Sequence, residues 1–217
     1  NHGCFAVCLR EIDGGCRTAD HDGGCVMKKK LGLGGVLAML AALCLALSAC
    51  SSKSDKAYPV AIDGTEIIVG ETKAGVLFDA GFTMKSVAPG MIGAADISPS
   101  QPMDANSYYT GVYMMKDDVK RVTLALVTEK ESVPVQDAVI ASVKIDSELD
   151  NPLEGVSFDG VALPDLTPAV LKEHVPDAED REDGSSSYFH GSSYSVRVNY
   201  IDGEPASLEV AREYDVD

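Results

Sequence analysis

Alternating hydrophobic and polar residues mark several β-strands in the second half of the chain. Positions 139, 141, 143 and 145 are apolar and alternate with more polar neighbours, and positions 194, 196, 198 and 200 follow the same rule. Successive side chains of a strand point to opposite faces, so this period of two predicts strands with one buried face. The valine- and leucine-rich run 121–128 predicts a further strand. The run 206–212 predicts another, which pairs across Asp202-Gly203 with the strand before it.

Tight turns and short helices are predicted earlier in the chain. The pairs Asp63-Gly64 and Asp159-Gly160 predict hairpin turns, because glycine accepts the positive φ that these turns require. Thr72 and Thr167 are suitable helix N-caps, since a threonine hydroxyl accepts a hydrogen bond from a free N–H of the first turn. An apolar face follows each threonine, and Gly81 predicts the end of the first helix.

Two segments of the chain resemble each other. Val60–Gly64 (VAIDG) matches Val156–Gly160 (VSFDG), and Ser107–Gly111 (SYYTG) resembles Ser187–Gly191 (SYFHG). Each half then has the order strand, strand, helix, strands. This order predicts an α+β fold of two tandem repeats with antiparallel sheets, 58–150 and 151–217. The alternative is two unrelated hairpins that share a common Asp-Gly turn.

Processing signals are predicted between residues 27 and 50. Met27 is followed by three lysines, and residues 31–49 carry no charge, which is the layout of a secretory signal. The residues Leu47-Ser48-Ala49-Cys50 resemble the lipobox of bacterial lipoproteins. The resemblance implies a signal peptide over 27–49, cleavage between Ala49 and Cys50, and a diacylglyceryl group on the Cys50 thiol. The alternative is an uncut transmembrane helix, for which roughly 20 apolar residues suffice.

The segments on either side of this signal follow from it. Residues 1–26 precede the signal and do not begin with methionine, so we interpret them as translated upstream sequence. The alternative is a small zinc site, although its spacings fit no paired Cys-x-x-Cys pattern; its ligands are His2, Cys4, Cys8, Cys16, His21 and Cys25. Residues 50–57 are predicted to be a lipidated tether, in which the seven residues after the cysteine reach at most about 25 Å.

Composition excludes several classes of function. The chain has 34 acidic and 18 basic residues, a net charge of −16, and this balance argues against nucleic-acid binding. All six cysteines lie at or before Cys50, so the body has no disulfide and no thiolate metal site. An acidic exterior suits solubility or a cationic partner. No cofactor is predicted.

Catalytic and metal-binding motifs are also missing from the body. His174 and His190 are its only histidines, and a hydrolase assembled from His190 with Ser192 or Ser193 is a weaker interpretation than a plain turn. Two acidic runs, 146–154 and 177–184, are candidate calcium loops but match no EF-hand spacing, so we interpret them as solvated loops. We therefore predict a protein without a catalytic or metal site.

Tyrosines within the predicted strands suggest a binding face. Tyrosine is enriched at protein interfaces, and outward-facing residues among them define a candidate surface; the set is Tyr108, Tyr109, Tyr113, Tyr188, Tyr194 and Tyr200. The alternative is that most of them pack beneath the helices. The segment 88–106 is predicted to be a long loop and a second candidate contact site.

The body also resembles known proteins in outline. The segment 60–81 resembles recurring domains of bacterial surface lipoproteins, and Gly70-Glu-Thr72 and Ala80-Gly-Phe82 carry the resemblance best. The matching segment 156–176 has Asp165-Leu-Thr167 and lacks the terminal Gly-Phe. The tandem helix-and-sheet layout is similar to that of the β-lactamase inhibitor protein, which implies a sheet face that binds protein.

These observations predict a lipid-anchored, non-enzymatic binding or structural protein on the outer face of a bacterial membrane. It would contact the membrane through lipid on Cys50 and have a possible protein partner. It is not expected to bind nucleic acid. The alternatives are an envelope enzyme whose active site these motifs do not reveal, and a small solute-binding lipoprotein. The mature chain is short for the two lobes that the last class needs.

Overall fold

The computed structural model describes residues 56–86, 94–149 and 151–215, which lie within one compact unit, Ser51–Asp217. The predicted upstream segment 1–26, the signal peptide 27–49 and most of the tether 50–57 lie outside the described residues. The lipidation and cleavage predictions for Ala49 and Cys50 therefore fall outside them as well.

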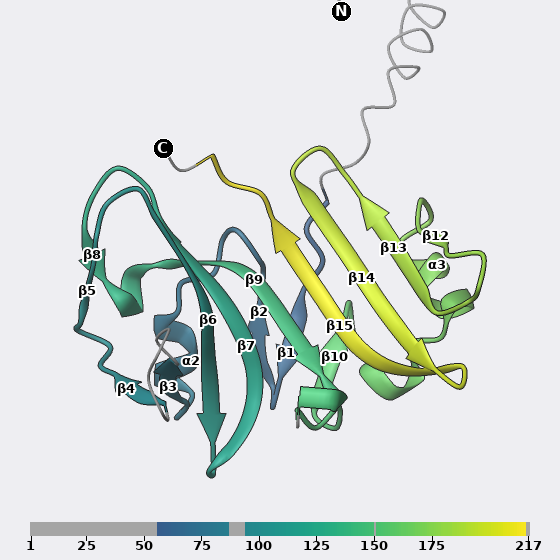
Figure 1. The fold of residues 1–217 in the computed structure, drawn as a ribbon, viewed down its shortest axis with the longest axis horizontal. Helices are drawn as coiled ribbons and strands as arrows, with labels where there is room; N and C mark the ends of the chain where they lie inside the picture. The colour runs from purple at the N-terminus through teal and green to yellow at the C-terminus, as the bar shows by residue number, and fades with distance from the viewer. Residues whose placement is uncertain (1–55, 87–93, 150, 216–217) are drawn as a thin grey trace, which may run out of the picture. The chain divides into compact units, whose positions relative to one another are not determined.

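A large antiparallel sheet of nine strands dominates the described residues, in the order β12-β13-β14-β15-β9-β7-β6-β3-β4 (Figure 1). Its strands are β3 (Thr83–Ser86), β4 (Ala95–Ile97), β6 (Ser107–Lys116), β7 (Val119–Thr128), β9 (Val139–Asp146), β12 (Glu179–Asp180), β13 (Ser186–His190), β14 (Tyr194–Ile201) and β15 (Glu204–Arg212). The predicted strands at 121–128, 139–145, 194–200 and 206–212 correspond to β7, β9, β14 and β15.

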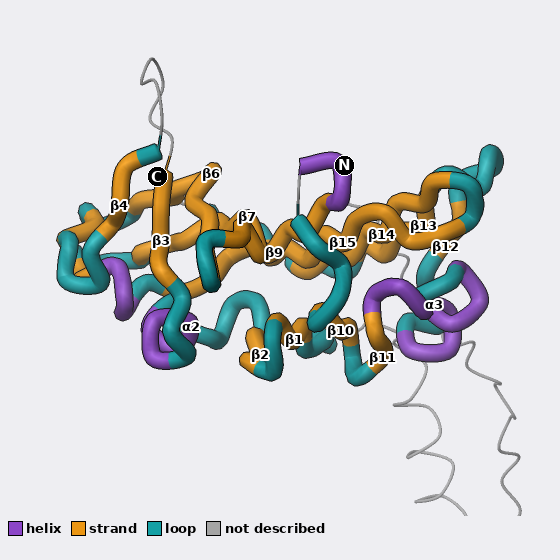
Figure 2. The backbone as a smooth tube through the Cα atoms, turned by 90° about the horizontal axis from the view of Figure 1, so that it is seen from below, coloured by secondary structure: helices purple, strands orange, loops and turns teal. Residues whose placement is uncertain are grey.

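A second layer covers one face of this sheet (Figure 2). Its centre is a four-stranded sheet in the order β11-β10-β1-β2, and two helices flank this small sheet. The elements are β1 (Val60–Ile62), β2 (Thr65–Ile67), β10 (Val156–Phe158), β11 (Val161–Ala162), α2 (Gly75–Asp79) and α3 (Pro168–His174). A ribbon of β5 (Pro102–Met103) and β8 (Val133–Pro134) and three short 3-10 helices complete the described fold; the helices are η2 (Val135–Asp137), η3 (Ser147–Leu149) and η4 (Leu163–Asp165).

The two layers enclose one main hydrophobic core. Alternate residues of the long strands point into it, for example Val196 and Val198 of β14 and Leu208 and Val210 of β15, all at most 1% exposed. Burial of these side chains is the main source of stability. Both sheets contain strands from 58–150 and from 151–217, because β9 pairs with β15 and β1 pairs with β10. The two segments therefore share a single core.

The predicted α+β fold class is wrong, because the described residues form a β-rich fold. Within them the two α-helices have only five and seven residues, whereas β6 and β7 have ten each. The segment 88–106, predicted to be a loop, contains the short strands β4 and β5. Short apolar faces after a threonine therefore predicted more helix than the chain forms.

The two predicted helix starts differ in outcome. The Thr167 hydroxyl accepts a hydrogen bond from the Val170 N–H and caps α3, as predicted. The Thr72 hydroxyl instead accepts from the Ile68 N–H upstream, and α2 begins only at Gly75, after Ala74. A hydroxyl that already serves the preceding turn does not cap the helix, so α2 begins at Gly75 and not directly after Thr72.

The predicted Asp-Gly hairpin turns are present. Asp63 and Gly64 have φ of 49° and 81°, and Asp159 and Gly160 have φ of 46° and 84°. Two successive positive φ values define the type I′ turn, whose twist matches that of a hairpin. Asp202 and Gly203 join β14 to β15 in the same way.

Candidate binding surface

Among the described residues, no second sheet and no α-helix lies over the outer face of the large sheet, opposite the second layer (Figure 2). One residue from each of its nine strands forms a continuous cross-strand row on this face, here called the polar row. Its members are polar and pair in register; they are Glu179, Tyr188, Arg197, Glu209, Lys144, Thr123, Tyr113, Lys85 and Asp96. Cross-strand pairs of opposite charge are favourable, so the row suits an exposed face.

Contacts at both ends of the polar row satisfy its own side chains. The Tyr188 hydroxyl donates to a Glu179 carboxylate oxygen at 3.1 Å, and this bond raises the Tyr188 pKa. At the other end, Lys85 Nζ lies 3.1 Å from Asp96 Oδ1, and this hydrogen bond raises the Lys85 pKa. These ends of the row are therefore internally compensated.

Small apolar residues replace the polar ones beside this row, at one end of the outer face. Ala125 and Val127 of β7 and Ala141 of β9 are at most 4% exposed and form a small cluster apart from the main core. Tyr214 packs against this cluster, and Tyr108 pairs in register with Val127 and is 40% exposed. We call these five residues the tyrosine patch.

Burial and nearby carboxylates raise the pKa of both tyrosine hydroxyls in the patch. The Tyr108 pKa is raised chiefly by burial and further by Glu209, while a hydrogen bond with Ser142 opposes the shift. The Tyr214 pKa is raised chiefly by burial, with Glu129 adding to it and Arg212 opposing it. Neutral phenols with flat apolar rings supply hydrogen bonds and contact area together.

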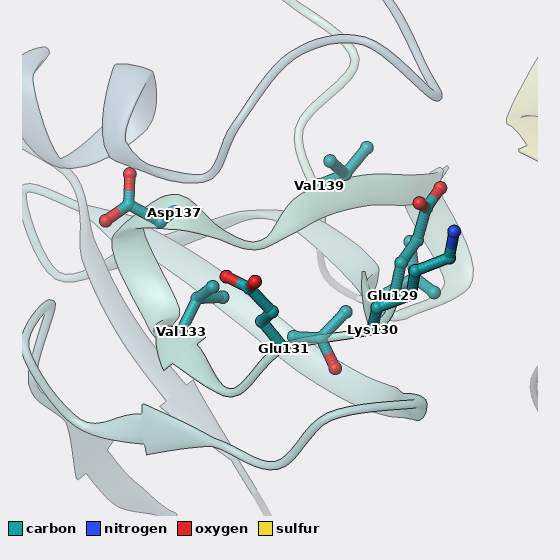
Figure 3. Close-up of a pocket in the computed structure, with 8 residues that line it drawn as sticks. Glu129, Lys130, Glu131, Val133, Asp137 and Val139 are labelled. Atoms are coloured by element: carbon teal, nitrogen blue, oxygen red, sulfur yellow. The ribbon is translucent and has the colours of Figure 1, made fainter.

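An open cavity of about 370 Å³ adjoins the tyrosine patch (Figure 3). Carboxylates of Glu129, Glu131 and Asp137 line it, together with the Lys130 ammonium group. Val133 contributes apolar wall, as do two valines of β7 and β9 that also belong to or pack against the patch cluster. We call this cavity the acidic cup, and it continues the patch.

The side chains of the acidic cup are spread around its opening. Glu129 and Lys130 lie together on one side, Asp137 lies on the other, and Glu131 lies between them (Figure 3). Asp137 already binds Lys73, with Oδ1 and Nζ 3.1 Å apart. The remaining two carboxylates outnumber the one ammonium group of the cup. A cationic side chain with an apolar stem fits this combination of walls and charges.

The six predicted tyrosines do not form a single face. Tyr194 and Tyr200 are 4% and 6% exposed and point into the main core, so they do not belong to a binding surface. Tyr113 and Tyr188 lie in the polar row, and only Tyr108 lies in the tyrosine patch. Tyr194 and Tyr200 alternate with polar residues in the same register as Val196 and Val198, and this pattern already indicates that they face inward.

Tyr109 lies on the other side of β6, where its register partner is the core residue Leu126. It lines a cavity of about 320 Å³ with Met84, Met103 and Val112. The prediction also missed Tyr214 and the carboxylates of the cup. They follow the ends of strands rather than lying within them, so alternation gave no signal for them.

The candidate catalytic and calcium residues are held by other contacts. His174 Nδ1 lies 2.9 Å from Asp159 Oδ2, and the His190 ring lies 5.7 Å from the Tyr188 ring, between centroids. In the acidic run 177–184, Asp180 binds Lys172 at 2.6 Å, which lowers the Asp180 pKa. Across the described ranges, no group of three or more histidine, cysteine or acidic residues is placed to hold a metal ion.

Two further results bear on the class of protein. Among the described residues, no helix is long and apolar enough to cross a membrane. No protein family, no curated protein and no solved structure matches this chain.

Proposed function

We propose that this chain is a lipid-anchored, non-enzymatic binding protein of the bacterial envelope. In this proposal, the tyrosine patch and acidic cup take up a basic segment of a partner protein. The anchor is supported by the signal at 27–49 and by Cys50 at its end. The observation that supports the binding role is the sheet face without a second layer, on which the patch and the cup adjoin.

Charge complementarity favours a basic partner. The chain carries a net charge of −16, and the cup has three carboxylates around one ammonium group. A field of this sign steers cationic partners toward the surface and repels phosphate-rich ones. The tyrosines add flat contact area at low entropic cost, which is why tyrosine recurs at binding surfaces. A lysine or arginine of the partner would enter the cup while its neighbours rest on the patch.

Photocrosslinking in intact cells tests this binding role. A benzoylphenylalanine at position 108 should give one discrete adduct, and the captured peptide should be rich in lysine or arginine. A matched probe at Glu173, exposed on α3 in the other layer, should give none.

Charge removal supplies the second arm of this experiment. The double variant Glu129→Gln and Glu131→Gln should abolish the adduct from position 108, because both side chains lose their charge but keep their size. The control Glu173→Gln should leave it unchanged. Equal labelling from positions 108 and 173, or an adduct that survives the double variant, would refute the proposed binding site.

A further inference from the structure

The point at which the chain enters the folded body is fixed by Tyr58. Its side chain is 4% exposed, and its ring stacks on Phe158 with the centroids 5.5 Å apart. The Tyr194 hydroxyl accepts a hydrogen bond from the Tyr58 N–H at 3.0 Å and donates one to the Tyr58 carbonyl at 3.1 Å. Lys56, two residues earlier, lies 3.8 Å from Asp159. The tether therefore ends at a buried, hydrogen-bonded attachment site.

Strand pairing places this attachment site at the same end of the large sheet as the tyrosine patch. Tyr194, which holds Tyr58, begins β14 and pairs with Arg212 at the end of β15. The Arg212 guanidinium lies over the Tyr214 ring, 5.9 Å from its centroid, and Tyr214 packs on the patch cluster. The acidic cup lies at this end too, because it includes Val139 at the start of β9.

The opposite end of the sheet carries tight turns instead. The Asp202-Gly203 turn follows Ile201, and the Asp117-Asp118 turn joins β6 to β7. Strands of eight to ten residues, at about 3.3 Å per residue, place these turns roughly 30 Å from the patch end.

We propose that the Tyr58 end of the sheet faces the bilayer, so that the tyrosine patch and acidic cup lie on the membrane-proximal end of the domain. This inference rests on the proposed lipid anchor at Cys50. The seven tether residues span at most about 25 Å, which is shorter than the sheet itself. The attachment end therefore stays close to the membrane, and the turn end projects away from it.

This orientation narrows the class of partner. The carboxylates of the cup repel anionic lipid headgroups, so the membrane itself does not occupy the cup. A partner must present its basic segment within reach of the same bilayer surface. The chemistry and position together fit a protein whose lysine- or arginine-rich segment lies next to its own membrane anchor.

Single-cysteine labelling tests the orientation, because no cysteine follows Cys50 in the sequence and Cys50 itself would be alkylated. The variants Ser192→Cys, Arg197→Cys and Ile201→Cys place an exposed thiol before, within and at the end of β14. Each is made in the full chain, processed in cells, labelled with a donor dye and reconstituted into phosphatidylethanolamine–phosphatidylglycerol vesicles that contain an acceptor lipid. Circular dichroism verifies the fold of each.

Energy transfer to the acceptor lipid should be strongest from position 192, weaker from 197 and weakest from 201. Equal transfer from all three, or the reverse order, would overturn the orientation while leaving the anchor intact. A chain that begins at Ser51, and so lacks both the predicted signal and Cys50, separates the two proposals, since it should not associate with the vesicles. If this chain does stay on the vesicles, the lipid is not what holds the domain there, and the orientation built on the anchor fails too.

Discussion

The Arg121 side chain joins three separate parts of the fold. Removal of the charged group that it binds should therefore lower the free energy of unfolding. It lies in β7 with its side chain 10% exposed. Its Nε donates to Asp63 Oδ2 at 2.9 Å, and its Nη2 donates to Asp63 Oδ1 at 2.7 Å and to the Glu154 carbonyl. Asp63 sits in the β1–β2 turn, so the pair fastens the second layer to the large sheet.

The substitution Asp63→Asn removes this charge but keeps the turn, because asparagine tolerates the positive φ of 49° at this position. A hydrogen bond to a charged group contributes about 1.5–3 kcal/mol, whereas a neutral one contributes about 1 kcal/mol. In the variant, Arg121 keeps one hydrogen bond, now to a neutral amide oxygen, and loses the other of its two bonds to the Asp63 carboxylate. The Asp63 side chain is 25% exposed, so water offsets part of the cost. We expect a loss of about 2 kcal/mol.

Urea unfolding followed by far-UV circular dichroism measures this loss as a lower midpoint at unchanged slope. The melting temperature should fall by roughly 4–8 °C for a domain of this size. Asp202→Asn is the matched control, since Asp202 occupies the same turn position but is exposed, and it should cost less than about 0.5 kcal/mol. Losses that agree within about 0.5 kcal/mol for the two variants would refute the role assigned to the pair.

Three further predictions follow from close contacts and burial. Gly155→Ala should destabilise the protein by about 2–4 kcal/mol in the same urea assay, because φ is +75° and a Cβ would lie 2.6 Å from Asp63 Oδ1. The control is Gly184→Ala, which has a similar φ of +70° but open space around the added Cβ, and it should cost about 1 kcal/mol. Tyr194→Phe should lower the free energy of unfolding by about 1–3 kcal/mol, because it leaves the buried N–H and C=O of Tyr58 without their partner. Tyr188→Phe is the control and should cost less, because the Tyr188 hydroxyl makes its bond at the surface. Equal costs for the two variants would contradict the role of Tyr194 in holding Tyr58. Burial also raises the Tyr194 pKa above its ordinary value of 10.0. The contribution of the neutral Tyr194 side chain to folding stability is therefore complete below pH 10 and should fall as the pH rises further. An ultraviolet titration in which every tyrosine ionises before the protein unfolds would contradict this.

Local signals in the sequence predicted the parts of the fold that are locally determined. The Asp-Gly turns need only two residues with positive φ, and the Thr167 cap needs only a hydroxyl without a competing partner. Thr72 has the same chemistry, yet its hydroxyl serves the Ile68 N–H, which depends on the path of the chain before it. The sequence pattern gave no means to distinguish these two threonines.

Features that depend on tertiary pairing were not predictable in this way. The nine-stranded sheet requires β9 to pair with β15 and β3 with β6, and no local pattern specifies strand partners. The tyrosine patch requires Tyr214, which follows the last strand, to fold back on Ala125 of β7. The predicted tyrosine face therefore contained only one member of the actual patch, Tyr108.

The central claim is that Cys50 becomes the lipid-bearing first residue of the working protein. Mass spectrometry of the N-terminal peptide from membrane-extracted protein tests it most directly. The account predicts a peptide that begins at Cys50 and carries the added mass of a diacylglyceryl group. An N-terminal peptide that begins at another residue, or an unmodified Cys50, would contradict the anchor and everything proposed from it.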